Sequence, residues 1–207
     1  MPDDSREAVI AKYTDKSRYK PEYIYGDIYV DDRRVEQSNK SNQAKDDFTR
    51  ELEAAKRFSK HFNCEIFLLP EGDENGNAIY AEKHKNPDSI IKGVFIDFKQ
   101  ARGTDTSIVH QFGRGLRQAD GVIITVGDGT SISKAVIWIN GKLKSLEKSH
   151  DGFVVIIEDD KGNYGTYSIN AKRLSAEENP FTTAQGLSSP NPESTNSQVN
   201  SNIPRHR

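Results

Sequence analysis

PDSIIKGVFIDFK, residues 87–99, is the stretch of the sequence that decides the fold. Its apolar run, residues 89–96, is interrupted by Lys92-Gly93, and this pattern predicts two strands joined by a tight two-residue turn. In such a hairpin the second strand returns past the start of the first. Residues just before the first strand are therefore expected beside residues at the end of the second.

Two acids and a lysine are predicted to meet at that end of the hairpin. Asp88 begins the first strand, Asp97 lies near the end of the second, and Lys99 points to the same side as Asp97 because strand side chains alternate. Neighbouring carboxylates repel each other unless a cation lies between them, and carboxylate oxygens suit Mg²⁺ or Mn²⁺. Such a metal polarises a phosphate and lowers the pKa of a bound water, while an ammonium stabilises charge on phosphorus. The pattern predicts a metal-dependent phosphodiesterase site; the alternative is an exposed hairpin with charged ends.

A helix is predicted upstream of the hairpin, over residues 42–62. Its apolar residues recur at helical spacing: Phe48, Leu52, Ala55, Phe58 and Phe62. Glu51 falls inside this apolar sector, whereas Glu53 points nearly the opposite way. An acid that faces a core needs a partner or a metal, so Glu51 is either a site residue or a boundary glutamate paired with a lysine.

Strands and a second helix complete the central segment. Residues 64–69 read as a strand that Pro70 ends, and a polar loop over residues 72–77 leads to the hairpin. Residues 104–119 read as a helix with one apolar face, in which Gly113 and Gly115 permit close packing or approach to a phosphate backbone. Residues 121–126 read as a buried strand. The predicted order is helix, three strands, helix, strand, in an α/β fold.

This order, together with Glu51, Asp88, Asp97 and Lys99, resembles the PD-(D/E)XK nuclease superfamily over residues 42–126. More narrowly, Leu-Pro-Glu at 69–71, Lys-Asn-Pro-Asp at 85–88, Ile-Lys-Gly at 91–93 and Asp-Phe-Lys at 97–99 are similar to the C-terminal tRNA nuclease domain of CdiA-type contact-dependent inhibition toxins. The resemblance implies a restriction-endonuclease-like core and a metal-dependent endonuclease. Glu51, Asp88 and Asp97 would be its acid ligands for Mg²⁺ or Mn²⁺, and Lys99 its catalytic lysine. It also implies tRNA or another RNA as the preferred substrate over DNA, an immunity protein as a partner, and delivery into another cell as a toxin.

Further polar residues are candidates for the same site. Glu71, directly after Pro70, is expected either to hold a metal-bound water or to lie in solvent. The candidate phosphate contacts are Lys85, Gln100, Arg102, Arg114 and Arg117, although a charged helix face is more often only solvated. Five scattered histidines and one cysteine give no zinc-ligand spacing.

The chain is expected to hold one nuclease-like domain over residues 42–174. Residues 1–41 are predicted as a partly ordered arm with a strand at 24–30, and the Ser-, Asn- and Pro-rich residues 175–207 as a disordered tail. A helix is expected at 131–148, and a hairpin of residues 153–157 and 164–169 is expected to extend the sheet.

The net charge of −2 and the isoelectric point near 6.2 argue against a strong nonspecific nucleic-acid binder. A local basic rim around the cleft would offset this balance. No apolar run approaches the roughly 20 residues of a membrane span, and the N-terminus lacks the apolar core of a signal peptide, so synthesis in the cytoplasm is expected.

Three alternatives to an RNA nuclease stay open from the sequence. The first is a noncatalytic nucleic-acid or partner-binding module that keeps the nuclease fold, and the second is a DNA nuclease of the same superfamily. The third is a structural protein of a mobile element or phage, which would leave Asp88, Asp97 and Lys99 far apart. Whether these three side chains converge in space separates the alternatives.

Overall fold

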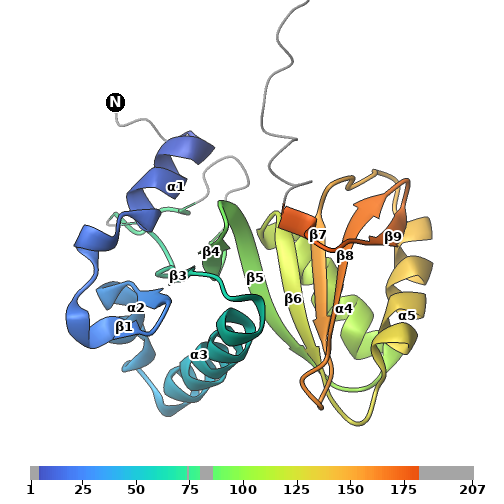
Figure 1. The fold of residues 1–207 in the computed structure, drawn as a ribbon, viewed down its shortest axis with the longest axis horizontal. Helices are drawn as coiled ribbons and strands as arrows, with labels where there is room; N and C mark the ends of the chain where they lie inside the picture. The colour runs from blue at the N-terminus through green and yellow to red at the C-terminus, as the bar shows by residue number, and fades with distance from the viewer. Residues whose placement is uncertain (1–4, 74, 80–85, 182–207) are drawn as a thin grey trace, which may run out of the picture.

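The described residues, 5–73, 75–79 and 86–181 of a computed structural model, form a mixed α/β fold with a nine-stranded sheet (Figure 1). The α/β class predicted from the sequence is confirmed, and the sheet is larger than expected. The strands lie in the sheet in the order of the sequence. They are β1 Ile24–Tyr25, β2 Ile28–Val30, β3 Ile66–Leu68, β4 Ser89–Ile91, β5 Val94–Ala101, β6 Gly121–Val126, β7 Val154–Glu158, β8 Tyr164–Asn170 and β9 Arg173–Ala176.

Five α-helices and two short 3₁₀ turns accompany these strands in the described part of the chain. The helices are α1 Arg6–Thr14, α2 Asp32–Ser38, α3 Asn42–Phe62, α4 Asp105–Gln118 and α5 Ile132–Lys144, and the turns are Lys16–Arg18 and Pro21–Tyr23. Residues 42–126 therefore follow the predicted order of helix, three strands, helix, strand. Each of these helices is too short or too polar to cross a lipid bilayer.

The sheet is antiparallel except at three pairs. β2 pairs with β3, β5 with β6, and β6 with β7 in parallel. Each parallel pair is joined by a crossover that contains a helix, because a parallel connection must return to the same end of the sheet. Helices α2 and α3 make the first crossover, α4 the second and α5 the third.

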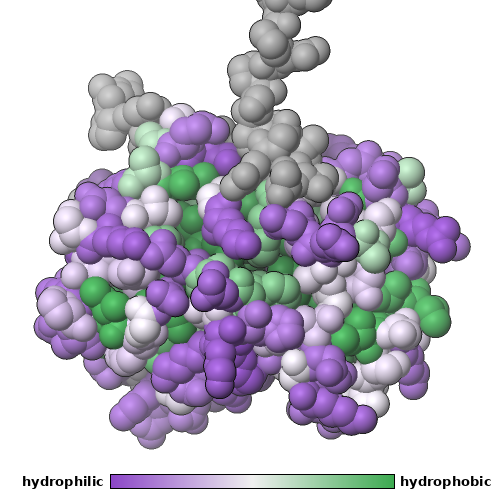
Figure 2. All heavy atoms as spheres, in the orientation of Figure 1, coloured by the Kyte–Doolittle hydropathy of each residue, from purple (hydrophilic) through white to green (hydrophobic). Residues whose placement is uncertain are grey.

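The two faces of the sheet belong to different apolar cores. Leu52, Ala55 and Phe58 of α3 pack with Ile123 and with other residues on one face. The neighbouring positions in β6 and β7 point the other way, where α4 and α5 cover them: Val122, Ile124, Val155 and Ile157. This alternation is the period-two pattern of a strand buried on both faces. The outward side of α3, at the lower centre of Figure 2, is mainly hydrophilic, as its amphipathic sequence predicts.

The hairpin predicted from the Pro-Asp stretch is confirmed. β4 and β5 pair antiparallel, with Ser89 opposite Ile96 and Ile91 opposite Val94. The two turn residues have left-handed backbone angles, φ 49° at Lys92 and 75° at Gly93. A turn with positive φ at both central residues matches the right-handed twist of the flanking strands, and glycine at the second position reduces its cost.

Both ends of the predicted domain need correction. The N-terminal region is part of the sheet, because β1 and β2 form a short hairpin where one strand at 24–30 was expected, and β2 pairs with β3. At the other end β9 extends the expected hairpin to three strands, and Phe181 is buried. The ordered domain thus continues past residue 175, and the predicted disorder from 182 onward lies outside the described residues.

The two glycines of α4 have different surroundings. A Cβ built on Gly115 would lie 2.7 Å from Cγ2 of Val122 in β6, whereas at Gly113 the nearest atom is the Arg117 guanidinium at 3.8 Å. Gly115 therefore sets how closely α4 approaches the sheet, and Gly113 has room for a side chain.

We expect Gly115→Ala to lower the free energy of unfolding by about 1–3 kcal/mol, because it overpacks this contact. Gly113→Ala is the matched control and should raise stability by up to about 1 kcal/mol through helix propensity. Urea unfolding of the two variants beside the parent measures both effects. Equal stability of the two variants would contradict the assignment of Gly115 to close packing.

Candidate active site

The pairing of β4 with β5 ends at the Ser89–Ile96 pair, and the predicted site begins there. Beyond that pair, β5 continues through Ala101, and Asp88 precedes β4. The main-chain N–H of Phe98 donates to Asp88 Oδ2 at 2.7 Å. If β4 were longer, its backbone would accept this hydrogen bond from β5. Here the Asp88 carboxylate accepts it instead, and this contact fixes the acid against β5.

The ammonium of Lys99 joins the two predicted acids. Its Nζ lies 2.5 Å from Asp97 Oδ2 and 3.8 Å from Asp88 Oδ2. Asp97 is fully buried, and the Lys99 side chain is 10% exposed. The predicted convergence of Asp88, Asp97 and Lys99 is therefore confirmed.

The Asp97 carboxylate is short of hydrogen-bond donors. The contact with Lys99 is close enough for an ion pair but lacks hydrogen-bond geometry, and neither oxygen of Asp97 has a hydrogen-bond partner among the described residues. Burial, then the charge of the neighbouring Asp88, raise the pKa of Asp97 to about 9, although Lys99 opposes the shift. A buried carboxylate with two unused oxygens is an arrangement that a cation would stabilise.

Glu51 reaches the same site from α3. Its side chain is 10% exposed and forms an ion pair with Arg34 of α2. The prediction that this acid needs a partner is correct, but the partner is an arginine, not a lysine. Burial and the nearby Asp88 charge raise the pKa of Glu51 to about 8, while Arg34 lowers it. Its Oε1 atom is buried and has no hydrogen-bond partner in the part of the chain that the structure describes.

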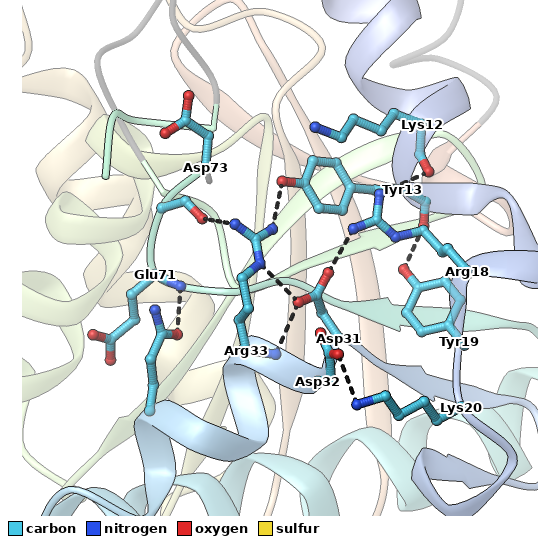
Figure 3. A network of polar contacts seen from close by, with 12 residues as sticks. Lys12, Tyr13, Arg18, Tyr19, Lys20, Asp31, Asp32, Arg33, Glu71 and Asp73 are labelled. Atoms are coloured by element: carbon cyan, nitrogen blue, oxygen red, sulfur yellow. Dashed lines mark hydrogen bonds and ion pairs between the residues drawn. The ribbon is translucent and has the colours of Figure 1, made fainter. Parts of the chain in front are cut away.

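A network of polar contacts fixes helix α2 and thereby Arg34 (Figure 3). Asp31 caps the helix by accepting from the Arg33 N–H at 3.1 Å, and it accepts from the Arg18 guanidinium at 2.8 Å. The Arg33 guanidinium in turn donates to the Tyr13 hydroxyl at 3.1 Å and to the carbonyl of Gly72 at 3.4 Å. The N-terminal helix, α2 and the loop after β3 are thus held together at the residue next to Arg34.

Glu51, Asp88 and Lys99 line a pocket of about 720 Å³ between α3, α4 and the end of β5, and the buried Asp97 is not part of its described lining. Its described lining contains the acids Asp47, Glu51, Glu71 and Asp88, the bases Arg34, Arg50, Lys99 and Arg114, and the neutral polar residues Asn86, Gln100, Gln111, Gln118 and Thr125. Acids and bases are thus equal in number. Of the basic rim predicted from the sequence, Lys99 and Arg114 are in this lining, where acids balance their charge.

The predicted contact residues divide into three groups. Glu71, Gln100 and Arg114 line the pocket, and the Glu71 side chain is 68% exposed at its edge, where its Oε1 lies 3.4 Å from the Arg34 guanidinium. Arg102 is exposed and is not part of the pocket lining, and Arg117 lines a separate surface hollow with Lys142. Lys85 lies outside the described residues. The structure therefore does not bring Arg102 and Arg117 to the pocket, and their contact with phosphate stays a prediction.

Among the pocket residues that sequence reasoning missed, three contribute buried polar atoms: Arg34, Gln111 and Gln118. Arg34 neutralises Glu51, and Gln111 and Gln118 bring buried amides into the wall. The only signal for Arg34 was the unpaired Glu51 in an apolar helix sector. The only signal for the glutamines was their position beside the apolar face of α4.

The acids of the site form only part of a ligand set for a divalent cation. In the described ranges, no three Asp, Glu, His or Cys side chains lie close enough together to form a complete metal site. Mg²⁺, however, is commonly held by one or two carboxylates together with waters and substrate phosphates. Asp88 and Asp97, with the unused oxygens of Asp97, fit that smaller donor set.

Comparisons of the chain with protein-family models, with curated proteins and with solved structures gave no match.

Proposed function

We propose that the chain is a metal-dependent endonuclease of the PD-(D/E)XK type that hydrolyses phosphodiester bonds, with tRNA or another RNA as its preferred substrate. The observation that supports this most is the contact of Lys99 with both Asp88 and Asp97 beside a pocket. The order of elements over residues 42–126 supports the family assignment. The preference for RNA follows the resemblance to the CdiA-type domain, and the immunity partner and delivery into another cell stay predictions.

Asp88 and Asp97 would hold the Mg²⁺ or Mn²⁺, with Glu51 and Glu71 close enough to orient a water. When bound, the metal would polarise the scissile phosphate and acidify a water. Asp88 is preorganised for this role because the Phe98 N–H fixes its carboxylate. Asp97 is preorganised because it is buried on a central strand.

Lys99 would stabilise the negative charge that develops on the phosphate oxygens. Its ammonium is held between two carboxylates, so its position does not have to be organised during the reaction. Arg114, at the pocket wall, would bind a neighbouring phosphate, and Arg34 would favour the charged form of Glu51 against the effect of burial.

The proposal is tested by incubating the purified protein with total tRNA, other RNA and DNA in Mg²⁺, Mn²⁺ or EDTA. Cleavage is expected with either metal and none with EDTA, and tRNA is expected to be cut faster than DNA. Asp97→Ala and Lys99→Ala proteins prepared in parallel should be inactive, which excludes a contaminating nuclease. Equal activity of the Asp97→Ala protein would refute the mechanism, and faster cleavage of DNA would shift the proposal to a DNA nuclease.

A noncatalytic nucleic-acid-binding module is the second candidate. The equal numbers of acids and bases in the described pocket lining argue against it. Such a module depends on basic surface for affinity. RNA binding without cleavage in either metal would support it.

A further inference from the structure

Two glutamine amides in the pocket wall, whose oxygens are buried, are not used by the proposed hydrolysis. The Oε1 atoms of Gln111 and Gln118 are buried and, within the residues described, have no hydrogen-bond partner. Both residues belong to α4, and a spacing of seven residues places them on the same side of the helix. Two other glutamines use their amides: Gln37 accepts from the Glu71 N–H, and Gln43 donates to Asp47.

An unpaired buried amide destabilises the protein unless a ligand pairs with it. The chemistry of the amide restricts that ligand. A carbonyl oxygen accepts hydrogen bonds, whereas phosphate groups and deoxyribose rings within a strand have no N–H or O–H to donate. The donors of a nucleic acid are the amino and imino groups of its bases and the 2′-hydroxyl of ribose. A glutamine amide, with one donor and one acceptor side by side, matches the edge of a base.

The charge of the molecule gives a second, independent reason. The described lining has as many acids as bases, and the net charge of the chain is −2. Affinity that depends only on phosphates needs a basic surface. A nuclease with this charge balance needs additional contacts to hold its substrate, and contacts to bases would supply them.

From these observations we infer that Gln111 and Gln118 form a subsite that reads a nucleobase close to the scissile phosphate. The inference rests on the proposed function, since it assigns the occupant of the same pocket. It predicts an enzyme that selects its cleavage position by base identity.

The test measures binding, so that it does not depend on catalysis. Gln111→Met and Gln118→Met, singly and together, are made in an Asp97→Asn background in which the strand stays intact. Methionine keeps the length of glutamine and removes the amide, and replacing an unpaired buried amide by an apolar group should not lower the melting temperature. His110→Met is the matched control, because His110 neighbours Gln111 on α4 but faces a different hollow.

Fluorescence anisotropy is recorded with labelled oligo(A), oligo(C) and oligo(U), and with DNA oligonucleotides of the corresponding bases. We expect the Asp97→Asn protein to bind its best base roughly 5- to 150-fold more tightly than its worst, the range for a good amide–base contact. The double methionine variant should bind all bases as weakly as the worst, and His110→Met should keep the preference.

Two results would overturn the inference. One is a base preference that survives both methionine substitutions, and the other is a preference for RNA over DNA that is equal for every base, which would assign the amides to the ribose hydroxyl. Failure of the unmutated protein to cleave any nucleic acid would instead overturn the proposed function. The anisotropy measurements would still show whether Gln111 and Gln118 bind a base, because they do not depend on cleavage.

Discussion

Replacement of Lys99 by methionine is expected to slow RNA cleavage by roughly 100- to 1,000-fold, the usual cost of losing one preorganised group that stabilises transition-state charge. The Lys99 ammonium lies 2.5 Å from Asp97 and 3.8 Å from Asp88, so it stands where the phosphate must approach the two acids. Methionine preserves the length of the side chain and removes only its charge. Single-turnover cleavage with enzyme in excess measures the effect on the chemical step.

Metal binding separates this role of Lys99 from that of a metal ligand. Because the substitution removes a cation from beside Asp88 and Asp97, Mn²⁺ should bind the Lys99→Met protein at least as tightly as the parent, as measured by calorimetry. Lys142→Met, in the separate hollow that α5 forms with α4, is the control and should change neither the cleavage rate nor Mn²⁺ binding. A cleavage rate within about threefold of the parent would remove Lys99 from the mechanism.

The sequence was sufficient to predict the parts of the site that local structure determines. The Lys92-Gly93 turn between two apolar runs fixes the register of β4 with β5, and the register alone brings Asp88 to Asp97. Glu51 could be assigned to the inner face of α3 because a helical wheel depends on only a few turns of chain.

The parts of the site that depend on contacts between distant segments could not be predicted. Arg34 reaches Glu51 because α2 packs against α3, and nothing near residue 34 in the sequence specifies that packing. A helical wheel gives the angle of Arg117 around α4, but it does not show which neighbouring element the side chain faces. In the structure Arg117 faces α5, with which it lines a hollow.

The composition of the C-terminal region was misleading for a related reason. An edge strand needs few apolar residues, and β9 is stabilised by one buried leucine together with a bond from outside the strand. The Leu174 N–H donates to the side chain of Asn140 in α5 at 2.7 Å. A Ser-rich composition therefore does not exclude a short strand when a helix supplies the hydrogen-bond partner.

Substitution of Asp97 by asparagine is expected to abolish cleavage and, in the absence of metal, to make the protein more stable. The buried Asp97 carboxylate has a pKa raised from 3.8 to about 9, so the folded protein keeps its proton over a pH range in which the unfolded chain releases it. Because the parent protein takes up a proton when it folds, its free energy of unfolding falls as the pH rises from about 4 towards 9. Asparagine has no proton to lose, and it leaves Lys99 paired with Asp88 alone.

At pH 8 in EDTA the Asp97→Asn protein should melt roughly 2–10 °C above the parent, which corresponds to about 1–3 kcal/mol for relieving one unsatisfied buried group in a chain of this size. The difference should shrink as the pH is lowered towards 5, because the proton that the parent takes up on folding costs less free energy at lower pH. Asp46→Asn, at an exposed position of α3, serves as the control and should melt like the parent at both pH values.

Addition of Mn²⁺ should reverse the order of the two melting temperatures. The parent gains stability in proportion to the logarithm of the metal concentration over its dissociation constant, whereas the variant has lost one of its two carboxylates and gains little. A variant that melts below the parent in EDTA at pH 8 would show that the buried carboxylate stabilises the fold by itself. In that case Asp97 would be a structural ion-pair partner of Lys99, and the unused oxygens at this position would no longer support a metal site.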